Sequence, residues 1–144
     1  MLKKINFHTH TKRCKHAKGE DKDYIDAAIK NNLDILGFSD HGPYPDNRFN
    51  LRMNFNELEE YKTTLEKLKI KFKNFIQIKI GLEIEYLPSD DFYYNYLKNE
   101  LKFDYLALGQ HLFLTENGEL KNTYSLKSTK EYIEYAKSIC LGIK

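Results

Sequence analysis

Short apolar runs along the chain alternate with longer segments in which apolar residues recur about every three or four positions. The compact apolar runs predict strands over residues 2–7, 35–38, 75–82 and 105–108. The segments with helical spacing predict helices over residues 22–31, 54–72, 89–101 and 129–141. This alternation favours an α/β fold, in which parallel strands are joined by right-handed crossovers and buried on both faces of the sheet.

Polar residues mark where these helices are expected to begin, because their side chains can accept hydrogen bonds from the unpaired N–H groups of the first turn. The candidate N-caps are, in chain order, Asp21 or Asp23, Asn54 or Asn56, Ser89 and Ser128. Gly42, Pro43 and Pro45 predict a loop after the second strand, and Asn117-Gly118 makes a hairpin possible. The Tyr-rich run 92–96 is interpreted as a half-buried helix face.

Composition narrows the classes of function. The chain has 144 residues, of which 41% are hydrophobic and 31% charged, and this predicts one soluble globular domain. A net charge of +2 does not indicate binding to nucleic acid or to a membrane. We find no apolar stretch of the roughly 20 residues that span a bilayer and no signal peptide. Cys14 and Cys140 lie far apart without CxxC spacing, so we expect no disulfide and a reducing, cytoplasmic location.

Histidines gather where the predicted strands end. The residues at or just beyond these C-terminal ends are His8, His10, His41, Glu83 and His111, with His16 further along the first loop. In parallel β/α barrels the catalytic groups collect at that face, whereas structural histidines would have no reason to do so. The sequence therefore predicts one cluster of imidazoles and a carboxylate.

Such a cluster suits divalent metal ions. His8 and His10 are two residues apart, so on extended backbone both rings point to one side and can hold one cation. Glu83 can bridge two cations, although it could instead pair with a lysine. Histidines with a carboxylate suit Zn²⁺, Fe²⁺ or Mn²⁺. Neighbouring ions of this kind can hold a phosphate and generate hydroxide, which predicts hydrolysis without a covalent intermediate.

Several of these residues also have an ordinary structural interpretation. His16 and His41 could be surface residues or hydrogen-bonded ones, and Asp40 could orient the ring of His41. Cys14 stands among basic residues that can lower the pKa of a thiol, but the Arg spacing of a cysteine phosphatase is absent, so we interpret it as structural or incidental. We find no GxSxG nucleophile motif and no P-loop.

Four segments resemble a known family. His8-Thr9-His10-Thr11, followed by Arg13-Cys14-Lys15-His16-Ala17, resembles the opening of the histidinol-phosphatases of the PHP (polymerase and histidinol phosphatase) family. The segments that resemble the family's next three motifs, in the right order, are Gly37-Phe38-Ser39-Asp40-His41, Gly81-Leu82-Glu83-Ile84-Glu85-Tyr86 and Leu108-Gly109-Gln110-His111.

The resemblance implies a distorted (β/α)7 TIM-like barrel, of which this chain would supply roughly the first four β/α units. It also implies three metal ions. One would be bound by His8 and His10 with Glu83 bridging, a second by His16 and His41, and a third by Glu83 and His111. The implied reaction is the hydrolysis of histidinol phosphate, a small phosphorylated metabolite of histidine biosynthesis.

The remaining site residues are assigned with the resemblance in mind. We predict Glu83 and Asp40 as catalytic residues. Arg48 and Arg52, in the loop after His41, are candidates for binding the substrate phosphate, and an ordinary surface role is equally open for both.

The chain departs from the family pattern after residue 141, where a further strand with a histidine, and later a paired Asp and His, would be expected. We therefore expect residues 1–144 to be a single, C-terminally incomplete PHP domain that binds metal weakly and self-associates through exposed sheet edges. An inactive metal-binding remnant remains a second hypothesis. A PHP phosphoesterase for another phosphate ester, such as a nuclease or a phosphotyrosine phosphatase, is a third, although the segments 13–17 and 83–86 argue against it.

Overall fold

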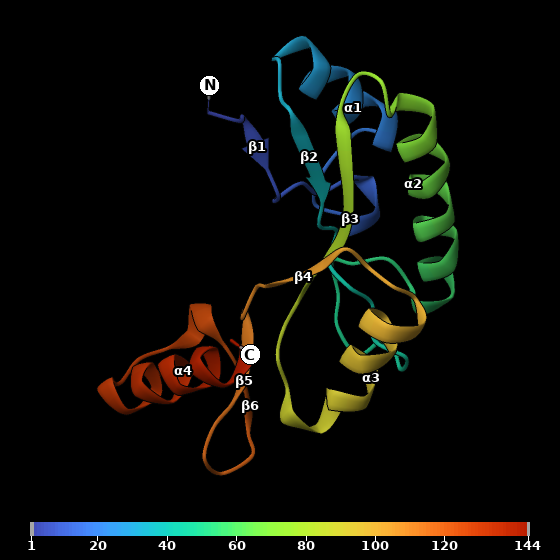
Figure 1. The fold of residues 1–144 in the computed structure, drawn as a ribbon. Coiled ribbons are helices and arrows are strands. Elements are labelled where there is room, and N and C mark those ends of the chain that lie inside the picture. Colours follow the sequence, from blue (N-terminus) through green and yellow to red (C-terminus); the bar gives the residue numbers. More distant parts are fainter. Residues whose placement is uncertain (1, 144) are drawn as a thin grey trace. The chain divides into compact units, whose positions relative to one another are not determined.

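The computed structural model describes residues 2–143, which form two compact units (Figure 1). The first unit contains Met1–Leu82 and Phe103–Leu106, and the second contains Glu83–Lys102 and Ala107–Lys144. Among the described residues, no helix has the length and apolar character needed to cross a membrane.

Four strands form one sheet in the order β1-β2-β3-β4. They are β1 (Ile5–Asn6), β2 (Ile35–Phe38), β3 (Gln77–Ile84) and β4 (Tyr105–Leu108). Strand β2 pairs in parallel with β1 on one side and with β3 on the other. The parallel pairing, with helices between the strands, confirms the predicted α/β class.

Burial differs from strand to strand. The side chains of β2 and β3 are mostly buried, whereas both residues of β1 are exposed and β4 is half-buried. The prediction that every strand is buried on both faces is therefore wrong for β1 and β4. The reason is their place in the sheet, because each lies at an end of the strand order and has a neighbouring strand on one side only.

Two helical segments of the first unit begin at capping boxes. Helix α1 (Asp21–Lys30) has Glu20 as its N-cap, and the carboxylate of Asp23 accepts a hydrogen bond from the Glu20 N–H at 2.8 Å. The predicted caps Asp21 and Asp23 are therefore wrong, since both lie inside the first turn. Before helix α2 (Leu58–Phe72) a 3-10 turn (Phe55–Glu57) begins at Asn54, as predicted.

Tyr105 connects three strands within the first unit. Its hydroxyl lies 2.9 Å from the carbonyl oxygen of Phe7 and 2.8 Å from that of Phe38, so its proton is shared between them. Its ring covers Gly81 so closely that a Cβ there would lie 2.5 Å from Tyr105 Cζ. On the helix side of β3, the Tyr61 hydroxyl donates to the carbonyl of Gly81 at 2.9 Å, which joins α2 to the sheet.

The second unit begins with a broken helical segment. It consists of a 3-10 turn (Pro88–Asp90), helix α3 (Asp91–Asn95) and a π-helical turn (Tyr96–Glu100). Ser89 lies inside the first of these turns, so its predicted role as an N-cap is wrong. The Tyr-rich run does form a half-buried face, because Tyr93 and Tyr94 are buried and Phe92 is exposed.

The rest of the second unit is a hairpin followed by a helix. Strands β5 (Leu112–Leu114) and β6 (Leu120–Asn122) pair antiparallel, which confirms the possible hairpin. A 3-10 turn (Thr123–Ser125) leads to helix α4 (Thr129–Gly142), which Ser128 caps as predicted by accepting the N–H of Glu131. Hydrogen bonds from the Lys121 ammonium and from the backbone of Lys127 and Ser128 lower the pKa of Glu131 to about 2.

Candidate metal centre

The loop after β1 turns back tightly. Thr11 caps a 3-10 turn (Lys12–Cys14), and the turn ends at Lys15, whose φ of 59° lies in the left-handed region. This reversal brings the imidazole of His16 next to that of His10, with ring centroids 5.1 Å apart.

Four histidines meet in the first unit. The ring of His10 is central, with its centroid 4.9 Å from that of His8 and 4.6 Å from that of His41. The rings of His16 and His41 are 5.2 Å apart, which closes a triangle with His10. One nitrogen from each of His10, His16 and His41 lies within 4.8 Å of the other two.

These donors fit a bound metal ion. Nε2 of His8 and Nε2 of His10 are 2.9 Å apart. A single cation can contact both, because a bond from Zn²⁺ to imidazole nitrogen is about 2.0–2.1 Å long and twice that length exceeds their separation. The four side chains are exposed or half-buried, so an ion can reach them from solvent.

Buried polar residues tie this loop to the end of β2. Asp40 is completely buried, and its carboxylate accepts the Thr11 N–H at 2.6 Å, the Thr11 hydroxyl at 2.8 Å and the Cys14 thiol at 2.9 Å. Next to it, the Thr9 N–H donates to Ser39 Oγ and the Ser39 N–H donates to the Thr9 carbonyl, each at 2.9 Å. Asp40 thus orders the loop that carries the histidines, and its predicted catalytic role stays a prediction.

The same loop is anchored to the helices of its unit through Arg13. Its guanidinium pairs with the carboxylate of Asp21 at the start of α1 and lies 5.3 Å from the ring centre of Tyr61 in α2. Because the Arg13 and Asp21 side chains are almost entirely buried, this ion pair holds the loop in one position.

A second group of ionisable side chains lies in the second unit. Nε2 of His111 is 3.9 Å from Glu83 Oε1, and its Nδ1 is 3.5 Å from Glu85 Oε1. Glu83 is only 4% exposed and Glu85 only 1%. The hydrogen bond with Glu85 raises the pKa of His111, and the charges of both carboxylates add to this rise against the effect of burial. Two buried carboxylates favour a cation beside them, because a buried charge is costly unless it is paired.

Gly109 makes room for one of these carboxylates. A Cβ at position 109 would overlap Glu83 Oε1, and the Gly109 N–H donates to the carbonyl of Ile84 at 2.9 Å. A residue without a side chain is therefore required between β4 and His111, because the Glu83 carboxylate occupies the space that a side chain would fill.

The two arginines proposed for phosphate differ in their surroundings. Arg52 is buried, and its guanidinium donates to the carbonyl of Gly42 at 2.8 Å. Arg48 is exposed, pairs with Asp46 at 2.9 Å and lies over the ring of Tyr44. Arg52 therefore supports the loop after His41, whereas Arg48 lies at the protein surface.

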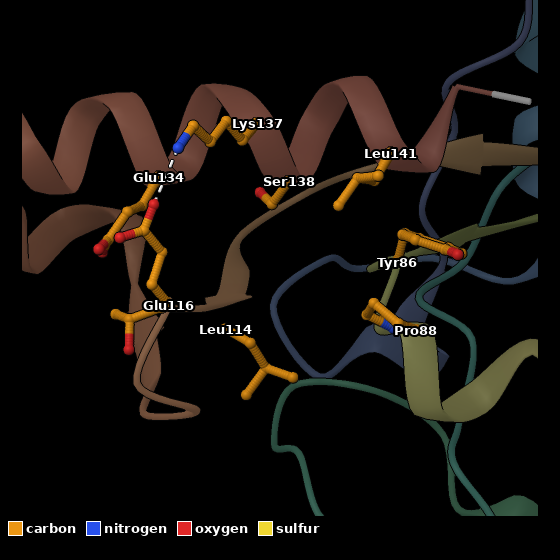
Figure 2. Close-up of a pocket in the computed structure, with 9 residues that line it drawn as sticks. Tyr86, Pro88, Leu114, Glu116, Glu134, Lys137, Ser138 and Leu141 are labelled. Carbon is orange, nitrogen blue, oxygen red and sulfur yellow. Dashed lines mark hydrogen bonds and ion pairs between the residues drawn. The ribbon is translucent and has the colours of Figure 1, made fainter.

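Two hollows lie on the described part of the chain, one in each unit. One, of about 350 Å³, is bordered by His8 and His10 within the first unit. The other, of about 260 Å³, lies in the second unit between the hairpin, α4 and the segment of Tyr86 and Pro88 (Figure 2). Figure 2 shows its charged end, where Lys137 pairs with Glu116 at 2.8 Å. Because its charges pair with each other and no histidine lines it, we assign no chemistry to the second hollow.

Two residues matter more than their sequence context indicated. Glu85, which enters the sequence prediction only as part of a motif, is buried against His111. Cys14, for which the sequence predicts a structural or incidental role, has its sulfur between Asp40 and His10. The sequence signal for the contact between Cys14 and His10 is their spacing, because a tight turn can bring together residues that are four positions apart.

The similarity to known proteins extends over both compact units. A family model described as "PHP domain" matches residues 6–143. A protein of Deinococcus radiodurans named "Probable histidinol-phosphatase" is 29% identical over 107 residues, which cover 72% of this chain and 40% of that protein. The histidinol-phosphatase of Bacillus subtilis is 25% identical over 153 aligned positions, covering 96% of this chain and 55% of the relative. The chain thus spans about half the length of these relatives.

A solved structure is similar in fold. It is the histidinol phosphate phosphatase of Lactococcus lactis, determined with zinc, L-histidinol and phosphate. The TM-score is 0.64 at 23% identity, and the match covers 98% of this chain and 52% of the other. This likeness, with the parallel sheet and its intervening helices, confirms the predicted fold as part of a TIM-like barrel.

Proposed function

The chain belongs to the PHP domain family, and from this premise we propose that it carries metal-binding residues of a phosphoesterase that hydrolyses a small phosphate monoester. The observation that carries the proposal is the meeting of His8, His10, His16 and His41 in one unit, with two Nε2 atoms close enough to share a cation. All five histidines of the chain lie either in this group or beside buried carboxylates.

The roles of the residues follow from their positions. The four histidines of the first unit are proposed to bind divalent cations, and Asp40 to keep their loop in place. Glu83 and His111 are proposed as ligands in the second unit, with Glu85 orienting the ring of His111. Zn²⁺, Fe²⁺ or Mn²⁺ suits this donor set and would supply activated water and positive charge for the hydrolysis of a phosphate ester.

The proposed substrate is histidinol phosphate. The support comes from relatives that are named histidinol-phosphatases and from the similar fold solved with L-histidinol and phosphate. Of the two candidate arginines, we propose only Arg48 for the substrate phosphate, because Arg52 is buried against a carbonyl. The family match runs through both compact units, and we therefore propose that residues 1–144 belong to a single PHP domain.

Metal content and phosphate release test the proposal together. The purified chain is reconstituted separately with Mn²⁺, Zn²⁺ and Fe²⁺, and bound metal is measured by elemental analysis after removal of excess ion. Phosphate release is then measured from histidinol phosphate, phosphotyrosine and an oligonucleotide, for this chain and for the complete product of its gene. We expect retained metal and, in the complete product, a preference for histidinol phosphate.

Variants connect the result to the site. His10→Ala and His41→Ala should each reduce both bound metal and turnover, because each removes a nitrogen donor from the cluster. Lys18→Ala changes an exposed residue in the loop between β1 and α1 and should leave bound metal and turnover unchanged. Metal retention without turnover in the complete product would favour the inactive metal-binding remnant. Absence of retained metal in the wild-type chain and in the complete product would refute the proposal.

A further inference from the structure

Cys14 occupies the centre of a buried hydrogen-bond network under the histidines. Its side chain is completely buried within the first unit. Its sulfur lies 2.9 Å from Asp40 Oδ1 and 3.2 Å from His10 Nδ1, and it accepts the His41 N–H at 3.0 Å. The sulfur therefore contacts the residue that orders the loop and two of the proposed metal ligands.

The chemistry of these neighbours determines where the protons are. A carboxylate can only accept and a backbone N–H can only donate, so the thiol proton points to Asp40 and a sulfur lone pair faces His41. A sulfur that already uses its only proton can meet His10 Nδ1 only as an acceptor. In this arrangement Nδ1 of His10 carries the proton, and the thiol donates to Asp40 while it accepts from His10 and His41.

This arrangement determines what His10 presents on its other side. With the proton on Nδ1, the lone pair of His10 lies on Nε2, the atom that is 2.9 Å from Nε2 of His8. In metal-binding sites, a carboxylate commonly receives a hydrogen bond from the nitrogen of a ligating histidine that is not bound to the metal, and so sets its tautomer and orientation. Here the thiol of Cys14 stands between the carboxylate of Asp40 and the ring of His10.

We propose that Cys14 is a positioning residue that transmits the orientation of Asp40 to His10 and so holds His10 Nε2 ready to bind a cation. This inference rests on the metal site proposed above and adds a residue and a mechanism to it. Asp40 is itself held by the N–H and hydroxyl of Thr11, so the network begins at a fixed point of the backbone. Sulfur suits the position because it is large enough to reach three partners from one small side chain.

The tautomer of His10 can be measured without metal. In the metal-free wild-type protein, ¹⁵N NMR of the imidazole nitrogens should place the proton of His10 on Nδ1. Cys14→Ala should convert His10 to a mixture of tautomers, because its acceptor is removed. Cys14→Ser keeps one donor and two acceptors and should preserve the Nδ1–H form in part. Cys140→Ala, which changes the exposed cysteine of α4, should leave the spectrum unchanged.

Zinc affinity is the second measurement, made by competition with a chromophoric chelator. Cys14→Ala should bind Zn²⁺ about 10–100-fold more weakly than wild type, the usual effect of losing a partner of a ligating histidine. Cys14→Ser should fall between the two, and Cys140→Ala should match wild type. If Cys14→Ala does not fold, the zinc affinity of Cys14→Ser and the His10 tautomer of the wild-type protein still decide the test.

Two results would overturn the role of Cys14. One is a wild-type protein in which His10 carries its proton on Nε2. The other is a folded Cys14→Ala variant with unchanged zinc affinity. If the wild-type chain binds no zinc while its His10 carries the proton on Nδ1, the proposed function fails but the hydrogen-bond assignment stands, so the two failures are distinguishable.

Discussion

Among single residues, the buried carboxylates of Glu83 and Glu85 and the missing side chain of Gly109 shape the candidate site. Glu83 and Glu85 are acidic residues in an otherwise apolar buried segment, a position that is unfavourable unless a cation is close. His111 supplies a protonatable ring to both carboxylates. The absence of a side chain at Gly109 leaves the space that the Glu83 carboxylate occupies.

Gly109→Ala should therefore displace the Glu83 carboxylate. Overpacking against a buried side chain typically destabilises a protein by about 1–3 kcal/mol, and here the methyl group and an oxygen of the buried Glu83 would compete for one place. We expect a lower urea midpoint together with a lower metal content. Ala107→Gly, in strand β4 two residues before Gly109, creates space instead of removing it and serves as the control for metal content. Unchanged metal content in a folded Gly109→Ala protein would mean that Glu83 is not a ligand.

The sequence predicts which residues belong to the site and at which strand ends they lie, but not which side chains contact one another. The five histidines and Glu83 were identified because they lie near the ends of apolar runs. Spacing places Cys14 close to His10, but its contact with Asp40 could not be predicted, because it depends on the direction of one sulfur towards a residue 26 positions away. Side-chain direction in a loop follows from its turn geometry, and the left-handed φ of Lys15 is not evident from a lysine in the sequence.

At the scale of secondary-structure elements, Tyr105 links strands that the chain places far apart. It belongs to β4, yet its hydroxyl lies at the carbonyls of Phe7 and Phe38, at the ends of β1 and β2. Burial raises the pKa of Tyr105, so the hydroxyl stays protonated and remains a donor at neutral pH. This bond helps to hold the two strand ends from which the histidine-bearing loops begin.

Tyr105→Phe removes this donor and keeps the ring. We expect a loss of about 1–2 kcal/mol in the free energy of unfolding, measured by urea denaturation, because two carbonyls share the lost partner. Tyr124→Phe is the matched control, since Tyr124 is 88% exposed, and exposed substitutions usually change stability by less than about 0.5 kcal/mol. Equal stability of the two variants would show that the Tyr105 hydroxyl does not hold the strands.

The predicted bounds of elements were accurate where apolar runs end at turn residues. Strands β2 and β4 have the predicted limits, because polar residues and glycine follow each apolar run directly. Strand β3 was predicted to end before Glu83, and it continues through Ile84. A prediction from apolar residues ends a buried strand before a carboxylate. It is therefore wrong at Glu83, where the proposed function requires a charged residue inside a buried strand.

At the scale of the whole molecule, bound metal should contribute to stability. The donors of the first unit come from the loop after β1 and from the loop after β2, so an ion bound by His10, His16 and His41 connects segments that are separate in the sequence. An ion that binds the folded protein and not the unfolded chain stabilises it by mass action, by about 2.7 kcal/mol at a concentration one hundred times Kd.

Zinc or manganese should therefore raise the thermal midpoint of the metal-free chain by about 5–10 °C at that concentration, given how a gain of this size usually shifts Tm in domains of similar length. The measurement is calorimetry at several ion concentrations, and a chelator should reverse the shift. A His10→Ala/His41→Ala double variant should lose the shift, while Lys18→Ala should keep it. An equal shift in the double variant would place the stabilising ion elsewhere, because these two substitutions remove two of the three nitrogen donors of the His10, His16 and His41 triangle.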